Sequence, residues 1–121
     1  MARIMVVDDS PTDVLNLKNM LSKAGYAVVE ATSGQDAIER IRQEKPDCVI
    51  MDVVMPGING FQATRTLSKD PATSHIPVLV SSSKNQETDR VWALRQGARD
   101  YIVKPVKETD LIAKIKTALG G

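Results

Sequence analysis

The sequence predicts a single-domain α/β protein, a doubly wound (βα)5 arrangement in which five parallel strands are covered by helices on both faces. Short apolar runs alternate with longer amphipathic stretches along the chain, which is typical of consecutive βαβ units. Most of these runs are too uniformly apolar for strands with one face in water. Because 121 residues suffice for one domain with a substantial core, we expect one domain over 1–121 and no separate output domain.

Each predicted strand is a short apolar run that ends beside a polar or turn-forming residue. The chain's single cysteine, Cys48, opens the third run, so an internal disulfide and a cysteine-based zinc site are both excluded. We expect Cys48 to be a small buried hydrophobic residue. The predicted strands are 4–7, 28–29, 48–51, 78–81 and 101–103.

The first predicted helix lies between Asp9 and Gly25. Ser10 can cap it, Pro11 suits its first turn, and Asp13 completes the spacing of a capping box. Gly25 is a typical C-terminal stop. The apolar residues expected on its buried face are Val14, Leu17 and Leu21.

The next two helices have signals of unequal strength. Ser33 with Asp36 indicates the start of the second helix, and a weaker pattern predicts a third from Gly60 through Leu67. The expected buried positions of the second helix are Ala37, Ile38 and Ile41.

The last two helices complete the alternation. One spans about 86–96 and stops at Gly97, with Val91 and Leu94 expected on its core face. Trp92 in this helix either packs against the sheet or the preceding helix, or belongs to a binding surface. The apolar face of the final helix consists of Leu111, Ile112, Ile115 and Leu119.

The overall charge gives no sign of a nucleic-acid or membrane partner. Sixteen basic side chains oppose fifteen acidic ones, and a net charge of +1 provides no attractive field for either polyanion. The N-terminal apolar run is interrupted by Asp8 and Asp9, and no apolar stretch is long enough to cross a membrane. We therefore expect a soluble, cytoplasmic protein, with the single histidine, His75, in a solvated loop.

Polar side chains follow four of the five predicted strands. Asp8 and Asp9 follow the first, Asp52 the third, Ser82 the fourth and Lys104 the fifth. One such aspartate alone is more often a turn residue or helix cap. Ligands of open parallel sheets bind at the carboxyl ends of the strands, so four polar strand ends together favour a functional site.

The three clustered carboxylates indicate a divalent cation. At about 4 Å and an effective dielectric near 20, each pair would repel by roughly 4 kcal/mol unless a cation intervened. Mg²⁺ suits oxygen ligands and keeps several waters, and the backbone carbonyl of Val54 could add another oxygen. With Lys104 beside the metal, such a site could accept a phosphoryl group on a carboxylate.

These motifs together resemble bacterial response-regulator receiver domains of the CheY-like superfamily. The resemblance rests on Asp8-Asp9, on 51–57 through Gly60, on Ser82 and on Lys104-Pro105, and it covers the whole chain. It implies the flavodoxin-like strand order 2-1-3-4-5. The segments Gly60-Phe61-Gln62-Ala63-Thr64-Arg65 and Arg95-Gln96-Gly97-Ala98-Arg99-Asp100-Tyr101 are similar to stand-alone twitching-motility receivers of the PilH type.

The resemblance also implies a role for each matching residue at the phosphorylation site. Asp52 would accept a phosphoryl group from a chemotaxis-type sensor histidine kinase. Asp8 and Asp9, with Asp52 and the Val54 carbonyl, would hold Mg²⁺. Ser82 and Lys104 would contact the phosphoryl group.

Further positions match the family's conformational elements. Pro105 would follow a cis peptide bond, and Tyr101 would be the switch aromatic residue. Tyr101 and Trp92 would then belong to a surface that binds a downstream motility protein. Val54 and Lys84, two residues past Asp52 and Ser82, would give slow to moderate loss of the phosphoryl group.

The expected function is phosphorylation-dependent signalling by a monomer, in control of type IV pilus twitching motility, and not enzymatic turnover of a substrate. Three alternatives stay open. They are a Mg²⁺-dependent phosphohydrolase that uses an aspartyl-phosphate, a phosphorylation-independent interaction module, and a receiver for flagellar chemotaxis or for draining phosphate from another receiver.

Overall fold

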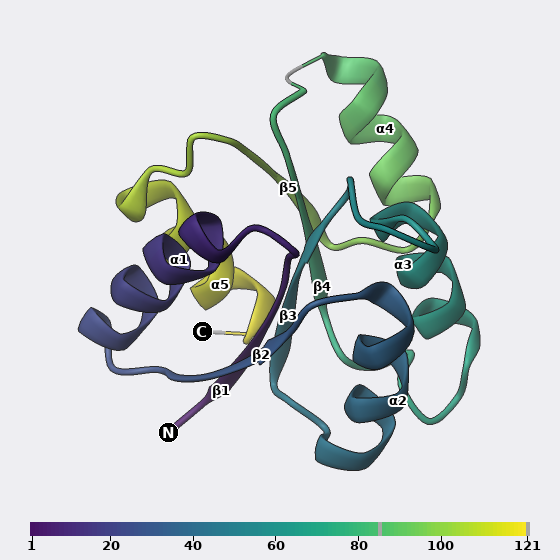
Figure 1. The fold of residues 1–121 in the computed structure, drawn as a ribbon, viewed down its shortest axis with the longest axis horizontal. Coiled ribbons are helices and arrows are strands. Elements are labelled where there is room, and N and C mark those ends of the chain that lie inside the picture. Colours follow the sequence, from purple (N-terminus) through teal and green to yellow (C-terminus); the bar gives the residue numbers. More distant parts are fainter. Residues whose placement is uncertain (85, 121) are drawn as a thin grey trace.

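The computed structural model describes residues 1–84 and 86–120, which form a sheet with helices on both sides (Figure 1). The strand order is β2-β1-β3-β4-β5 and every neighbouring pair is parallel, so the predicted fold class and strand order are confirmed. The strands are β1 (Arg3–Val7), β2 (Ala27–Ala31), β3 (Cys48–Asp52), β4 (Val78–Ser82) and β5 (Asp100–Val103). The helices are α1 (Pro11–Lys23), α2 (Gly34–Glu44), α3 (Gly60–Lys69), α4 (Glu87–Arg95) and α5 (Glu108–Ala118).

The sheet separates two apolar cores. Helices α1 and α5 cover one face, and α2, α3 and α4 cover the other (Figure 1). The three central strands are buried, whereas β2 at the edge has mostly half-buried residues. Cys48 is buried, as predicted, and burial raises the pKa of its thiol to about 12.

Local signals explain where the helices begin and end. The Ser10 hydroxyl accepts a hydrogen bond from the Asp13 backbone N–H at 3.4 Å, and Ser33 accepts one from Asp36 at 3.1 Å. Gly25 has a φ of +93°, which stops α1 as expected. Helix α3, predicted from a weak pattern, has the full capping box, in which Asn59 and Gln62 bond each other's backbone N–H groups.

Two expectations about packing were wrong in detail. Ile38 is half-buried, because it lies at the margin of the core that Ala37 and Ile41 enter. The predicted core face of α4 does not form: Val91 is exposed, Leu94 is half-buried, and Ala93 is the buried residue. Asp13 has the predicted spacing from Ser10, and its carboxylate bonds Lys104 and not the Ser10 backbone N–H that a full capping box would use. Among the described residues, no helix combines the length and apolar composition needed to cross a membrane.

Candidate functional site

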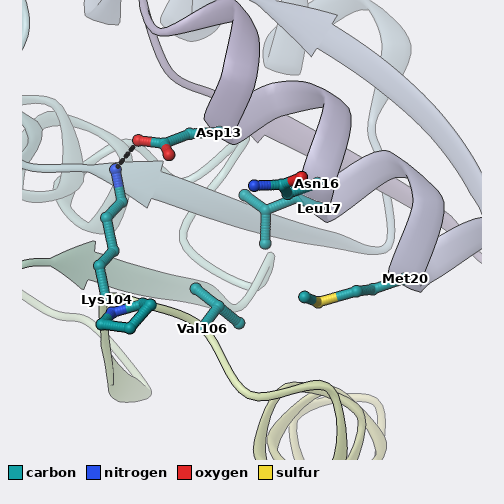
Figure 2. A pocket seen from close by; sticks show the side chains of 7 residues that line it. Asp13, Asn16, Leu17, Met20, Lys104 and Val106 are labelled. Atoms are coloured by element: carbon teal, nitrogen blue, oxygen red, sulfur yellow. Dashed lines mark hydrogen bonds and ion pairs between the residues drawn. The ribbon is translucent and has the colours of Figure 1, made fainter.

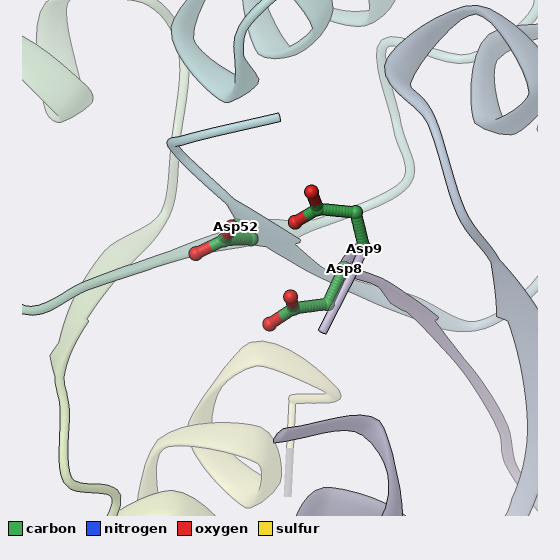
Figure 3. Close-up of side chains that lie close together, drawn as sticks. All are labelled: Asp8, Asp9 and Asp52. Atoms are coloured by element: carbon green, nitrogen blue, oxygen red, sulfur yellow. The ribbon is translucent and has the colours of Figure 1, made fainter. Parts of the chain in front are cut away.

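Three carboxylates meet at the carboxyl edge of the sheet (Figure 3). Val7 and Met51 are register partners on the adjacent strands β1 and β3, so the residues that follow them, Asp8 and Asp52, lie side by side. Asp9 comes next along the chain. One oxygen from each carboxylate can be chosen so that all three lie within 4.8 Å of one another. Asp8 and Asp52 are buried and Asp9 is exposed, so the cluster is open to solvent on one side.

The cluster has the chemistry of a hard-cation site. Three carboxylates at this spacing repel by about 3 kcal/mol per pair at an effective dielectric near 20. Their ligand atoms are all oxygen, which Mg²⁺ prefers, and the exposed side leaves room for water ligands. The carboxylates of Asp8, Asp9 and Asp52 therefore fit a divalent cation.

Lys104 brings a positive charge to the same place. Its Nζ donates to Asp8 Oδ2 at 3.0 Å, to Asp52 Oδ1 at 2.9 Å and to Asp13 Oδ2 at 2.9 Å. Asp13 comes from the first turn of α1, opposite the loop that carries Lys104 and the cis peptide bond to Pro105 (Figure 2). The ammonium is thus held by carboxylates from three separate segments.

The pKa shifts reflect burial and these contacts. Burial raises the pKa of Asp52, and the hydrogen bond and charge of Lys104 oppose that rise without cancelling it. For Lys104, burial alone would lower the pKa, but hydrogen bonds to Asp13, Asp52 and Asp8 outweigh it and leave the pKa raised. Lys104 is therefore a permanent cation at neutral pH, and it cannot act as a base.

Ser82 ends β4, just before the segment that leads to α4, and Tyr101 lies on the neighbouring strand β5. The buried Ser82 hydroxyl accepts a hydrogen bond from the Lys84 backbone N–H at 3.2 Å, which leaves its own O–H proton for another acceptor. The Tyr101 ring is buried, and its hydroxyl donates to the Lys84 carbonyl at 2.8 Å. Both side chains are therefore joined to the same short loop.

Gly60 connects the site to α3. Its N–H donates to the Val53 carbonyl at 2.9 Å, directly after Asp52. A Cβ at position 60 would lie 2.1 Å from the Asp52 carbonyl oxygen, so only glycine fits. This close approach holds the first residue of α3 against the backbone of Asp52.

The remaining predicted residues lie around this centre. Val54 is 72% exposed, and Lys84 is exposed as well. Trp92 is 50% exposed and does not fill a core position. His75 is exposed in its loop, as predicted.

Sequence reasoning missed Asp13 as a member of the site. Its position three residues after Ser10 already explained it as part of a helix cap, and nothing local points to Lys104. The available signal was its place in the first turn of a helix that starts at the carboxyl edge, where Lys104 also lies.

Comparison with known proteins points to one family. The model for the response regulator receiver domain matches residues 4–116. The protein PilH of Pseudomonas aeruginosa is 57% identical over 121 residues, covering 100% of both chains. The chemotaxis protein CheY of Thermotoga maritima is 38% identical over 112 residues, with 91% of each chain covered. Several other curated relatives are longer, and the chain spans 26% to 52% of their length.

One similar solved structure contains a metal ion. The receiver domain of the sensor histidine kinase PA1611 from Pseudomonas aeruginosa is 26% identical, with a TM-score of 0.91 over 99% of this chain and 98% of that one. That structure has a magnesium ion coordinated in its active-site cleft. The likeness covers the whole sheet and its helices.

Proposed function

The chain belongs to the response regulator receiver domain family, and from this premise we propose that it accepts a phosphoryl group from a histidine kinase on Asp52. One observation carries the choice of residue. Asp8 and Asp52 both belong to the three-aspartate cluster and both accept from the ammonium of Lys104, but only Asp52 ends the strand beside β4, where it pairs in register with Ser81, next to Ser82. A phosphoryl group attached there would lie between two sources of positive charge.

The transfer is a displacement at phosphorus. An oxygen of the Asp52 carboxylate attacks the phosphorus of a phosphohistidine, and the O–P bond forms as the P–N bond breaks. The electron pair of the broken bond returns to the imidazole nitrogen. Lys104 and the Ser82 O–H donate hydrogen bonds to phosphoryl oxygens and stabilise the negative charge on them.

Asp8, Asp9 and Asp52, with the backbone carbonyl of Val54, would hold Mg²⁺ in this proposal. When bound, the ion neutralises the carboxylates and the incoming phosphoryl group. The oxygen-only donor set supports this assignment, as does the magnesium in the cleft of the related receiver domain.

We place the output on α4 and the neighbouring strand β5, with the protein acting as a monomer. A hydrogen bond from Ser82 to the phosphoryl group would draw the following loop toward Asp52. Because the Tyr101 hydroxyl bonds the Lys84 carbonyl in that loop, the movement would break or shift this contact. Trp92 and Val91 on α4, both exposed, would then present a changed surface to a downstream motility protein.

The biological setting we propose is control of twitching motility by type IV pili. Its support is a relative of equal length named PilH, with the similarity of 60–65 and 95–101 to receivers of that type. The signalling role is distinct from substrate turnover, because the acceptor is the protein's own Asp52.

Acetyl phosphate labelling tests the acceptor and the metal together. With Mg²⁺, wild-type protein should gain one phosphoryl group on Asp52, detected by mass spectrometry, and Asp52→Asn should gain none. EDTA should abolish labelling, and Asp9→Ala should weaken both Mg²⁺ binding and labelling. Equal labelling in EDTA would overturn the metal's role, and rapid continuous release of phosphate from added esters would favour a phosphohydrolase.

The output surface needs a separate test. Tyr101→Ala should leave labelling of Asp52 intact while Trp92 fluorescence no longer responds to it. If amide chemical shifts in α4 and β5 were the same with and without the phosphoryl group, the output would lie elsewhere.

A further inference from the structure

Asp13 contacts Lys104 but stands apart from the carboxylate cluster. Its Oδ2 accepts a hydrogen bond from Lys104 Nζ at 2.9 Å, as short as the one to Asp52 (Figure 2). Asp13 is not among the three carboxylates close enough together to share a cation. Its side chain is 39% exposed, whereas that of Lys104 is 17% exposed. The contact therefore joins α1 to the edge of the site.

All the donors of Lys104 are in use. An ammonium has three N–H groups, and here each has a carboxylate acceptor, on Asp8, Asp13 and Asp52. A phosphoryl oxygen can bind Lys104 only if one of these acceptors gives way. The identity of the acceptors that stay decides where the ammonium is held during the transfer.

Two of the acceptors change their chemistry in the proposed reaction. Asp52 loses its negative charge when its oxygen bonds phosphorus, so its attraction for Lys104 falls. Asp8 belongs to the cluster that fits a divalent cation, and its carboxylate is then shared between two positive charges. Of the three, only Asp13 neither bonds phosphorus nor belongs to the cluster that fits a cation.

We propose that Asp13 is a positioning residue, which holds the Lys104 ammonium beside Asp52 while Asp8 and Asp52 change partners. This inference rests on the proposed phosphoryl transfer and adds a residue to it. The hydrogen bond that Lys104 donates to Asp13 keeps the Lys104 side chain extended toward α1. A flexible lysine chain without this contact would spend much of its time away from the phosphoryl group.

A structural role in capping α1 has to be separated from this. The cap itself uses the backbone N–H of Asp13 and the Ser10 hydroxyl, so the carboxylate is free of it. Asp36 is a matched control. It has the same position after the capping Ser33 in α2, and its carboxylate pairs with Arg40 at 3.6 Å. Helix α2 covers the opposite face of the sheet from α1 (Figure 1).

The first measurement compares labelling rates with acetyl phosphate and Mg²⁺. The Asp52 oxygen bonds phosphorus while the bond from phosphorus to the acetate oxygen breaks, and acetate leaves with the electron pair. We expect Asp13→Asn to be labelled roughly tenfold more slowly than wild type, because Lys104 is less well placed. Asp13→Glu should recover most of the rate, and Asp36→Asn should match wild type.

A Lys104→Met background shows whether Asp13 acts through the ammonium. Methionine keeps the apolar stem of Lys104 and removes its charge. If Asp13 acts by positioning Lys104, Asp13→Asn should change the residual rate in this background by less than about twofold. An equal tenfold loss in both backgrounds would overturn the proposal.

The second measurement needs neither metal nor phosphoryl donor. By NMR on metal-free protein, the end of the Lys104 side chain should be more mobile in Asp13→Asn than in wild type or Asp36→Asn. Unchanged mobility, or labelling of Asp13→Asn at or above the wild-type rate, would overturn the positioning role. If wild-type protein itself took up no phosphoryl group, the proposed function would fail, while the mobility measurement would still test the contact.

Discussion

Helices α1 and α4 both begin at the carboxyl edge of the sheet, but they are held there very differently. Helix α1 has 13 residues, a serine cap and an ion pair from its first turn to Lys104. Its core side chains are Val14, Leu17 and Leu21. Helix α4 has 9 residues, and among the described residues its first turn receives no side-chain capping bond. Its buried residue is Ala93, while Trp92 is 50% exposed and Val91 is 38% exposed.

The two helices therefore suit different tasks, because α1 is held firmly in place and α4 is not. The proposed transfer needs Lys104 and the carboxylates in fixed positions, and α1 supplies one of the fixed contacts. The proposed signal needs a segment that moves for a small free-energy cost, and α4 has little buried apolar area to lose. We therefore expect α1 to support the proposed phosphoryl transfer and α4 to undergo the conformational change that a partner detects.

The largest expected difference is in stability. Leu17→Ala in α1 should lower the free energy of unfolding by about 3 kcal/mol, because a fully buried leucine leaves a cavity. Trp92→Ala in α4 should cost under about 1 kcal/mol. Urea unfolding of the two variants, with unchanged slopes, measures both values. Similar costs for the two would contradict the comparison.

Hydrogen exchange should resolve the two helices in the unmodified protein. Amides of α4 should exchange roughly 10- to 100-fold faster than the central amides of α1, because local opening of α4 breaks few core contacts. Residue-resolved exchange by NMR or mass spectrometry gives the ratio directly. Protection of α4 equal to that of α1 would show that it is not the softer element.

Adding a side-chain cap to the N-terminus of α4 should reduce the difference in amide exchange between α4 and α1. Gln86 has an extended backbone, with φ −81° and ψ 147°, which suits a capping serine. Gln86→Ser should stabilise α4 by about 1 kcal/mol and slow its amide exchange about fivefold. Ser33→Ala in α2 is the control in the opposite direction. If Gln86→Ser left α4 exchange unchanged, the absent cap would not be the cause of its softness.

The smallest expected effect concerns the hydrogen bond that ties β5 to the loop before α4. Tyr101→Phe removes the hydroxyl that donates to Lys84, at an expected cost of about 0.5 to 1 kcal/mol. Amides of 83–84 should exchange faster while those of α1 stay the same. Tyr26→Phe, on the α1 side of the sheet, is the matched control. Faster exchange in both variants would point to a general loss of stability.

The sheet and most of the site could be predicted because both follow from local pattern. Apolar runs identify the strands, and parallel strands bring their carboxyl ends to one edge, so Asp8, Asp52 and Lys104 had to be neighbours. The exact boundaries of the strands could not be predicted, because they depend on which residues of neighbouring strands pair. The pairing of Ala27 with Arg3 extends β2 beyond the two valines that the pattern indicates.

The missed features depend on contacts between distant segments. The ion pair of Asp13 with Lys104 joins positions 91 residues apart, and a local cap already explained the aspartate. Ala93 is buried in place of Val91 because of how closely α4 approaches the sheet. The spacing of apolar residues along the helix does not determine that distance. A repeat of apolar residues predicts that a helix forms, but it does not predict how closely that helix packs against the sheet.

The junction at Gly60 limits which sequences can support this site. With the Asp52 carbonyl 2.1 Å from the place of a Cβ, even alanine would push α3 away from β3. Substitutions that adjust the packing of α3 must therefore lie in its later turns, because no larger residue fits at Gly60 beside the backbone of Asp52. A designer who wished to transplant the proposed acceptor Asp52 onto another sheet would have to carry Gly60 along with the carboxylates.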